Sequence, residues 1–196
     1  MTFRVKMVAA LAVLGLVGIA TTAVAYDKWS GFRANISGYE EVPTLSTDAN
    51  GTFKASFDRG GDRIRYTLRY EGPFNANNTP TGGTVTQAHI HLGARGVNGG
   101  VIVFLCANPP QGPPAGVPTP PTCPATEGTV TGELTKDHVI GPAGQGIAAG
   151  EFAELVRAMR AGATYVNLHT QAPFQGGEIR GQIKGGDRGT HRGKGD

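Results

Sequence analysis

Apolar and polar residues alternate one by one along residues 51–57 and again along residues 63–70. A period of two is typical of a β-strand with one buried and one solvated face. The connection between the two runs contains Gly60 and Gly61, which suit a tight turn. The pattern therefore predicts a β-hairpin with apolar side chains, such as Phe53, on one face.

The rest of the chain repeats this pattern in short runs separated by glycine-rich turns. Residues 31–37 place Phe32, Ala34 and Ile36 on one face. Further strands are predicted at residues 84–92, 100–105, 128–135, 164–170 and 178–184. Many short strands joined by turns predict an all-β fold, either an antiparallel Greek-key sandwich or a barrel.

One segment, residues 151–160, has a different period. Phe152, Leu155 and Met159 recur at helical spacing with charged residues between them. Gly162 follows as a C-terminal cap. These features predict one short amphipathic helix that covers part of the core.

The first 25 residues have the features of a secretory signal peptide. Arg4 and Lys6 precede an apolar stretch at residues 7–20, and residues 23–25 form a small-x-small cleavage site. The protein is therefore expected to be secreted or periplasmic, with no stable membrane span after cleavage. An uncleaved membrane anchor is the alternative.

Residues 26–184 are predicted to form one domain, and the glycine-rich residues 185–196 a disordered tail. Cleavage would leave 16 basic and 15 acidic residues, because Arg4 and Lys6 are two of the 18 basic ones. This balance gives no support for nucleic-acid binding, which needs a concentrated basic face.

Cys106 and Cys123, the only cysteines, flank the proline-rich residues 107–122. Two cysteines around a loop in an exported protein predict a disulfide. Closing that loop would stabilise the fold by roughly 3 kcal/mol, and less where prolines already stiffen the unfolded chain. A metal site with cysteine ligands is the alternative.

Three of the five histidines lie in predicted strands. His89 and His91 are separated by one residue, so both imidazoles project from the same face of a strand. His169, in the strand at residues 164–170, can supply a third ligand to one metal ion. Alternatively, the histidines are half-buried structural residues.

Four motifs occur in order along the chain. They are Ser-Gly-Tyr-Glu-Glu-Val-Pro at 37–43, Ala-His-Ile-His-Leu-Gly at 88–93, Ala-Gly-Ala-Thr-Tyr-Val-Asn-Leu-His-Thr at 161–170 and Gly-Glu-Ile-Arg-Gly-Gln-Ile at 177–183. Together they resemble the CHRD domain, named for its repeats in chordin. The resemblance covers about residues 32–184 and implies an all-β extracellular domain. Chordin binds signalling ligands, which makes an extracellular protein partner an alternative function here.

The His-x-His strand, followed by glycines, is also similar to the copper-binding strand of Cu/Zn superoxide dismutases. The sequence has no histidine and aspartate cluster suited to their separate zinc site, so the similarity implies a copper-only site. Imidazole nitrogens suit copper in both oxidation states.

If the chain is an enzyme, copper-dependent superoxide dismutation is the most concrete reaction. Arg180 is then the catalytic candidate, because its positive charge can attract superoxide, a small anion, toward the metal. Its structural alternative is an ion pair with Glu178 or Glu41. Glu41 is in turn the candidate for orienting a ligating imidazole, and otherwise anchors a loop.

Two functions therefore remain open. The first is binding of a transition metal, copper, through His89, His91 and His169, with dismutation or simple sequestration as the outcome. The second is a non-catalytic extracellular module that binds a protein or matrix component. His138 is predicted to be a solvent-exposed loop residue. The sequence contains no Gly-x-Ser-x-Gly elbow and no phosphate-binding loop.

Overall fold

The computed structural model describes residues 31–58, 60–74, 83–171 and 173–185. The predicted signal peptide at 1–25 and the tail at 186–196 lie outside these residues. Gly185, which the sequence pattern assigned to the tail, pairs with Phe32 in a strand. In the described part of the chain, no helix is long and apolar enough to span a membrane.

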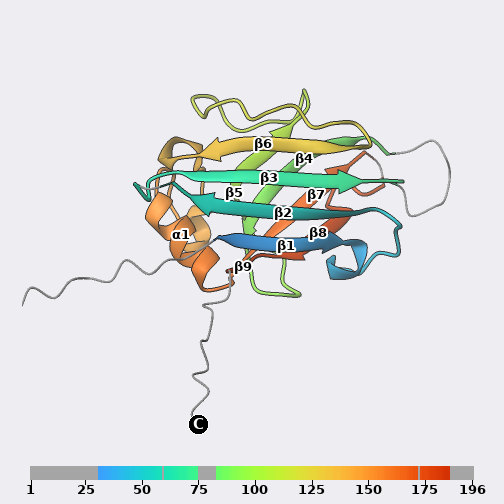
Figure 1. The fold of residues 1–196 in the computed structure, drawn as a ribbon, viewed down its shortest axis with the longest axis horizontal. Coiled ribbons are helices and arrows are strands. Elements are labelled where there is room, and N and C mark those ends of the chain that lie inside the picture. Colours follow the sequence, from blue (N-terminus) through green and yellow to red (C-terminus); the bar gives the residue numbers. More distant parts are fainter. Residues whose placement is uncertain (1–30, 59, 75–82, 172, 186–196) are drawn as a thin grey trace, which may run out of the picture.

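The described residues form nine strands in one antiparallel, nearly closed sheet, which confirms the predicted all-β fold (Figure 1). The strand order is β5-β4-β7-β8-β1-β2-β3-β6, with β9 beside β1. The strands are β1 (Phe32–Ser37), β2 (Asn50–Phe57), β3 (Ile64–Glu71), β4 (Val85–Leu92), β5 (Val101–Ala107), β6 (Glu127–Leu134), β7 (Thr164–Thr170), β8 (Ile179–Gln182) and β9 (Lys184–Gly185).

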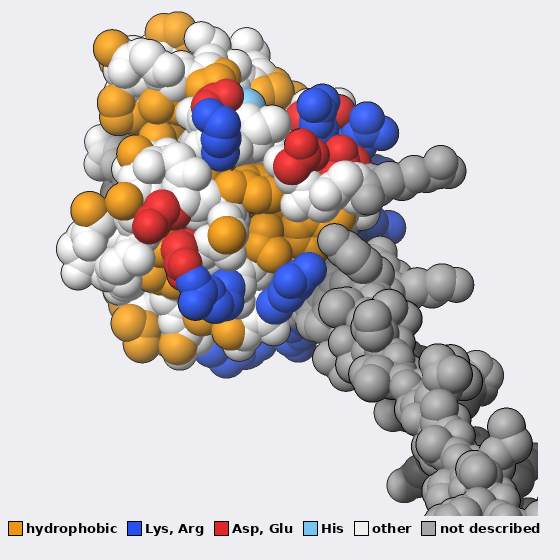
Figure 2. Space-filling model, turned by 90° about the vertical axis from the view of Figure 1, so that its left-hand side faces the viewer, with side chains coloured by type: hydrophobic (Ala, Val, Ile, Leu, Met, Phe, Trp, Pro, Cys, Tyr) orange, Lys and Arg blue, Asp and Glu red, His pale blue; other side chains and the backbone are white. Residues whose placement is uncertain are grey.

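The predicted helix is also present, as α1 (Phe152–Arg160), with Leu155 and Met159 buried. It lies at one end of the sheet (Figure 1). Figure 2 shows this end of the molecule, where hydrophobic side chains lie among basic and acidic ones. Three short 3₁₀ turns complete the described structure: η1 (Gly38–Glu40), η2 (Lys136–His138) and η3 (Ala143–Gln145).

The sheet folds back on itself into two layers. A front layer contains β1, β2, β3 and β6, and a back layer contains β4, β5, β7 and β8 (Figure 1). The layers are joined by pairing between β1 and β8, where Ser37 is opposite Arg180. The predicted disulfide forms between Cys106, in β5, and Cys123, which precedes β6. It therefore links the end strand β5 to the segment that leads into the other end strand, β6.

The predicted hairpin is confirmed as β2 and β3, which pair from Phe57 opposite Ile64 to Asn50 opposite Glu71. This register places the apolar face of each strand toward the back layer, because buried and exposed residues alternate along both strands.

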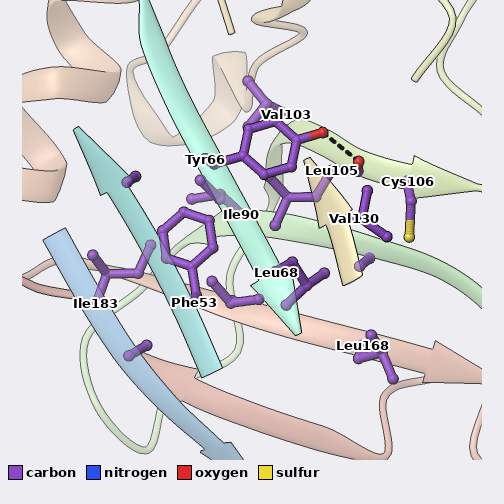
Figure 3. Close-up of a cluster of buried hydrophobic side chains, with 14 of the residues drawn as sticks. Phe53, Tyr66, Leu68, Ile90, Val103, Leu105, Cys106, Val130, Leu168 and Ile183 are labelled. Carbon is purple, nitrogen blue, oxygen red and sulfur yellow. Dashed lines mark hydrogen bonds between the residues drawn. The ribbon is translucent and has the colours of Figure 1, made fainter. Parts of the chain in front are cut away.

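The core fills the space between the two layers (Figure 3). Phe53 and Leu68 from the front layer, with Ile90 and Leu168 from the back layer, are fully buried. Tyr66 donates a hydrogen bond from its hydroxyl to the carbonyl oxygen of Leu105, 2.5 Å away, and so connects β3 to β5. From the back layer, the core contains side chains of the inner face only. The side chains on the outer face of that layer are therefore not part of this core.

Candidate metal centre

The histidines lie on the outer face of the back layer, opposite the core. Ala88 and Ile90 of β4 point into the core, so His89 and His91 between and after them point outward. β4 pairs with β7 in a register that places Gln87 opposite His169. His169 therefore shares this face, on the neighbouring strand.

The three imidazoles are adjacent and buried. Their exposed fractions are 3% for His89, 7% for His91 and 6% for His169. The ring centroid of His89 lies 5.3 Å from that of His91 and 4.8 Å from that of His169. One nitrogen from each ring lies within 4.8 Å of the other two. The structure thus brings together the three predicted ligands, from two strands about 80 residues apart.

Hydrogen bonds fix the protons on two of the rings. Nδ1 of His91 lies 2.9 Å from the carbonyl oxygen of Gly99, and Nδ1 of His169 lies 2.9 Å from that of Gln175. A carbonyl only accepts, so each Nδ1 carries the proton and each Nε2 keeps a lone pair. Nδ1 of His89 is 3.1 Å from Nε2 of His169, and in the metal-free protein it donates to that lone pair.

This arrangement leaves nitrogen atoms without partners in a buried place. Nε2 of His89 and Nε2 of His91 have no hydrogen bond among the described residues. Buried polar atoms are normally satisfied, and those that are not commonly mark a functional site or an additional ligand.

Burial keeps the three imidazoles neutral. Desolvation, with smaller contributions from the neighbouring imidazoles, lowers the pKa of His89 to about 2. Desolvation also lowers the pKa of His91 to about 4, against the opposing effect of the hydrogen bond to Gly99. The pKa of His169 is lowered by the same burial. Neutral imidazole is the form that binds metal ions, so no proton has to leave these rings at neutral pH.

Tyr165 connects the histidines to Arg180. The ring of His91 stacks on Tyr165 with centroids 4.8 Å apart and planes 9° from parallel. The guanidinium carbon of Arg180 lies 3.4 Å from the centroid of the same tyrosine ring. The Tyr165 hydroxyl accepts a hydrogen bond of 3.0 Å from the backbone N–H of Gly99, whose carbonyl orients His91. Tyr165 and Gly99 together fix the position of the His91 ring.

Arg180 is buried, with 1% of its surface exposed. Its guanidinium donates to Oδ1 of Asn98 at 3.0 Å and to the carbonyl oxygens of Ala94 and Val97 at 3.1 and 2.8 Å. These partners belong to the loop that follows β4. Arg180 thus anchors this loop, and its charge is one of the causes that lower the pKa of His91.

Glu41 is buried beside this cluster, near Asn167. A Cβ placed on Gly177 would lie 2.6 Å from the side-chain amide of Asn167 and 2.8 Å from Oε1 of Glu41. Both groups therefore face the bare backbone of Gly177, whose φ of +131° also favours glycine. Desolvation raises the pKa of Glu41 to about 7, although the charge of Arg180 lowers it. Oε1 of Glu41 and Oδ1 of Asn167 have no partner among the described residues.

The predicted role of Glu41 in orienting an imidazole stays a prediction. His91 and His169 donate their Nδ1–H hydrogen bonds to the carbonyl oxygens of Gly99 and Gln175, and not to Glu41. Glu178, the other suggested partner of Arg180, accepts hydrogen bonds from the hydroxyls of Thr47 and Thr170. The structure has no ion pair between Arg180 and either acid within the described ranges.

Sequence reasoning did not single out Tyr165 or Asn167. They precede His169 by four and two residues in the same strand, so the period of two already placed them on the histidine face. His138 was expected to be solvent-exposed, and this was wrong. It is half-buried and accepts a hydrogen bond at Nδ1 from the backbone N–H of Thr135, 3.1 Å away.

The polar cluster contains residues from all the motifs singled out in the sequence. The first supplies Glu41, the second His89 and His91, and the others supply residues of β7 and β8. A family model for the CHRD domain matches residues 32–183. The chain belongs to the CHRD domain family. No curated protein and no protein of known structure gave a significant match to this CHRD domain.

Proposed function

We propose that this CHRD domain binds one transition-metal ion, copper, through His89, His91 and His169. The observation that carries the proposal is the meeting of three buried, neutral imidazoles with donor nitrogens within 4.8 Å of one another. Within the described residues, Nε2 of His89 and Nε2 of His91 have no hydrogen-bond partner.

The donor set favours copper over the hard cations. Three nitrogens with no carboxylate oxygen suit copper and zinc, whereas calcium and magnesium prefer oxygen ligands. Copper binds such nitrogen sites more tightly than the other divalent ions of its row. His91 and His169 would bind through Nε2, because their Nδ1 atoms are occupied by carbonyl groups.

Metal binding requires only a small movement of the rings. Ligand nitrogens about 2.0 to 2.1 Å from an ion in a trigonal or tetrahedral site lie roughly 3.3 to 3.6 Å from one another. The largest separation, up to 4.8 Å, therefore closes by about 1.2 to 1.5 Å. The two nitrogens of His89 and His169 that lie 3.1 Å apart are already close to this spacing. For His89 to bind through Nδ1, its proton would move to Nε2, and the ring would stay neutral.

Superoxide dismutation is the reaction that we propose for the metal-loaded protein. Copper supplies the one-electron chemistry by cycling between two oxidation states. Arg180 contributes a fixed positive charge beside Tyr165 and His91, which attracts an anion toward the site. The export signal expected in residues 1–25 would place this activity in the periplasm or outside the cell.

The metal site is tested by copper analysis of the protein after loading and dialysis. We expect about one copper per chain, and a loss of affinity of about 100-fold or more for His91→Ala, because a ligand is removed from a buried site. His138→Ala is the matched control, since it removes a histidine from η2. Equal copper content in all three proteins would reject the metal site and leave an extracellular recognition module with structural histidines.

The reaction needs its own test, because sequestration requires the same ligands. Superoxide decay is measured for the copper-loaded protein and for Arg180→Lys and Arg180→Gln. We expect Lys to retain most of the rate and Gln to reduce it about 10-fold, since only the first keeps the charge. Equal rates for the two variants would remove Arg180 from the reaction, and a rate no faster than that of free copper would leave sequestration.

A further inference from the structure

The front layer carries a row of basic residues on its outer face. Arg33 of β1 lies directly opposite Lys54 of β2 on one side and Lys184 of β9 on the other. Adjacent strands are about 4.8 Å apart, so the three cations follow one another across about 10 Å. All three side chains are exposed.

The two lysines of this row leave positive charge on the face. In the part of the chain that the structure describes, neither Lys54 nor Lys184 forms a salt bridge. Both side chains are exposed, so their charge can attract an anion from solution.

Further positive charge lies on the next strand. Arg65 and Arg69 of β3 are exposed on the same face, at positions that alternate with the core residues. Glu133 of β6 pairs with Arg65 at 2.9 Å, and Glu71 lies at the far end of β3, opposite Glu127. These acidic residues thus lie toward β6. Glu40 lines a hollow with Arg33 and Lys184, but its carboxylate pairs with Arg95 at 2.7 Å, so the face over β9, β1 and β2 stays basic.

A groove of about 430 Å³ crosses this basic face. Cationic and hydroxyl groups alternate along its lining, where Arg33, Lys54 and Arg65 lie with Ser56 and Thr67. Charged donors beside hydroxyls suit a ligand that carries both sulfate or carboxylate groups and sugar hydroxyls.

We propose that this face binds an anionic polysaccharide, which runs from Lys184 of β9 across β1 and β2 to β3 along the groove. An extended polymer fits a row of charges that crosses several strands better than a single small anion does. Nucleic acids fit less well, because single strands require exposed aromatic side chains for base stacking. The large exposed hydrophobic residues in the described ranges are Tyr39 and Val97, and neither lies on these strands. The proposal does not depend on the metal site.

Dextran sulfate serves as the probe, and its binding to the full mature protein is measured by titration at low and at physiological salt. We expect Lys54→Ser/Lys184→Ser to weaken binding about 10-fold and to make its salt dependence shallower. The control, Lys136→Ser/Arg157→Ser, removes two exposed cations that pair with acids elsewhere. It changes the net charge equally and should leave affinity within about twofold.

The outcomes separate the alternatives. Equal weakening by both double variants would show binding to overall charge and overturn the proposal. Equal binding of uncharged dextran would do the same, because the cations would then be irrelevant. If single-stranded DNA of matched charge bound more tightly than dextran sulfate, the polysaccharide would be the wrong class of partner.

Discussion

Side chains alternate between two faces in both layers of the sheet, but the outer faces of the two layers differ in their exposure to solvent. In β3 of the front layer every second residue is exposed, whereas all seven residues of β7 in the back layer are buried. Alternation therefore sets which side chains share a face, and it does not decide whether that face meets solvent.

The difference comes from the loops. Residues 93–100 are held against the back layer by the hydrogen bonds of Arg180 to Ala94 and Val97. Residues 38–49 contact the same side through the hydrogen bond of Thr47 to Glu178. Polar side chains under this cover must find partners inside the protein, and those that lack one indicate where a ligand binds. On the front layer, water satisfies the same kinds of residue, so charge accumulates there instead.

The largest expected difference between the layers is in acid sensitivity. The unfolded histidine pKa is about 6.5, and the folded values of His89 and His91 are about 2 and about 4. The unfolded chain binds more protons between pH 6.5 and pH 4, so the stabilisation present above pH 6.5 is lost as the pH falls through this window. The strands of the front layer contain no histidine.

Urea unfolding of the metal-free protein at pH 7.5 and pH 4.5 measures this effect. Between the two pH values, the free energy of unfolding should fall by roughly 5 kcal/mol more in the parent than in His89→Gln/His91→Gln. Glu41 also has a shifted pKa, but it is present in both proteins, so its contribution to the pH dependence cancels in the comparison. Identical pH profiles would mean that the imidazoles are hydrated rather than buried.

Removing one arginine from each outer face compares the contribution of the two faces to the free energy of unfolding. Arg180→Ala should reduce the free energy of unfolding by about 3 to 4 kcal/mol, because it leaves the carbonyls of Ala94 and Val97 without donors and opens a cavity. Arg69→Ala, on the exposed face of β3, should cost less than about 0.5 kcal/mol. Chemical denaturation measures both, and equal losses would contradict the contrast between the layers.

Loss of the disulfide is expected to cause the next largest decrease in the free energy of unfolding. Cys106 and Cys123 are 17 residues apart, and opening this loop in Cys106→Ala/Cys123→Ala should cost roughly 3 kcal/mol. The bond joins β5 of the back layer to the segment before β6 of the front layer. Thermal unfolding of the variant and of the reduced parent should show the same decrease, and an unchanged midpoint would show that the layers need no covalent link.

The smallest predicted effect has the opposite sign. The pKa of Glu41 is raised from 4.5 to about 7, so the buried carboxyl is neutral at acid pH. Its ionisation destabilises the folded protein as the pH rises through 7. Glu41→Gln should therefore raise the free energy of unfolding by roughly 2 kcal/mol at pH 8 and leave it nearly unchanged at pH 4. Destabilisation at pH 8 would instead show that the carboxylate is held by a cation or an ordered donor.

Much of the fold could be predicted because its signals are local. The alternation around the Gly60–Gly61 turn gave the β2–β3 hairpin, and helical spacing gave α1. His89 and His91 share a face because of their spacing alone. His169 was harder to place, since only the β4–β7 register brings it beside them.

Other parts of the site depend on residues far apart in the sequence. No local pattern indicates that Arg180 stacks on Tyr165 and donates to the loop after β4. The basic row has the same origin, because Arg33, Lys54 and Lys184 become neighbours only through strand pairing. Net charge, which is a sum over the chain, cannot reveal such segregation.

By itself, the sequence determined the strands, the helix, the disulfide and the face on which each histidine lies, because these follow from periodicity over a few residues. The tertiary structure decided which outer face is buried, which imidazoles lie next to one another and where the basic residues form a row. Those outcomes depend on loop closure and strand register, and both are set by packing between segments that lie far apart along the chain.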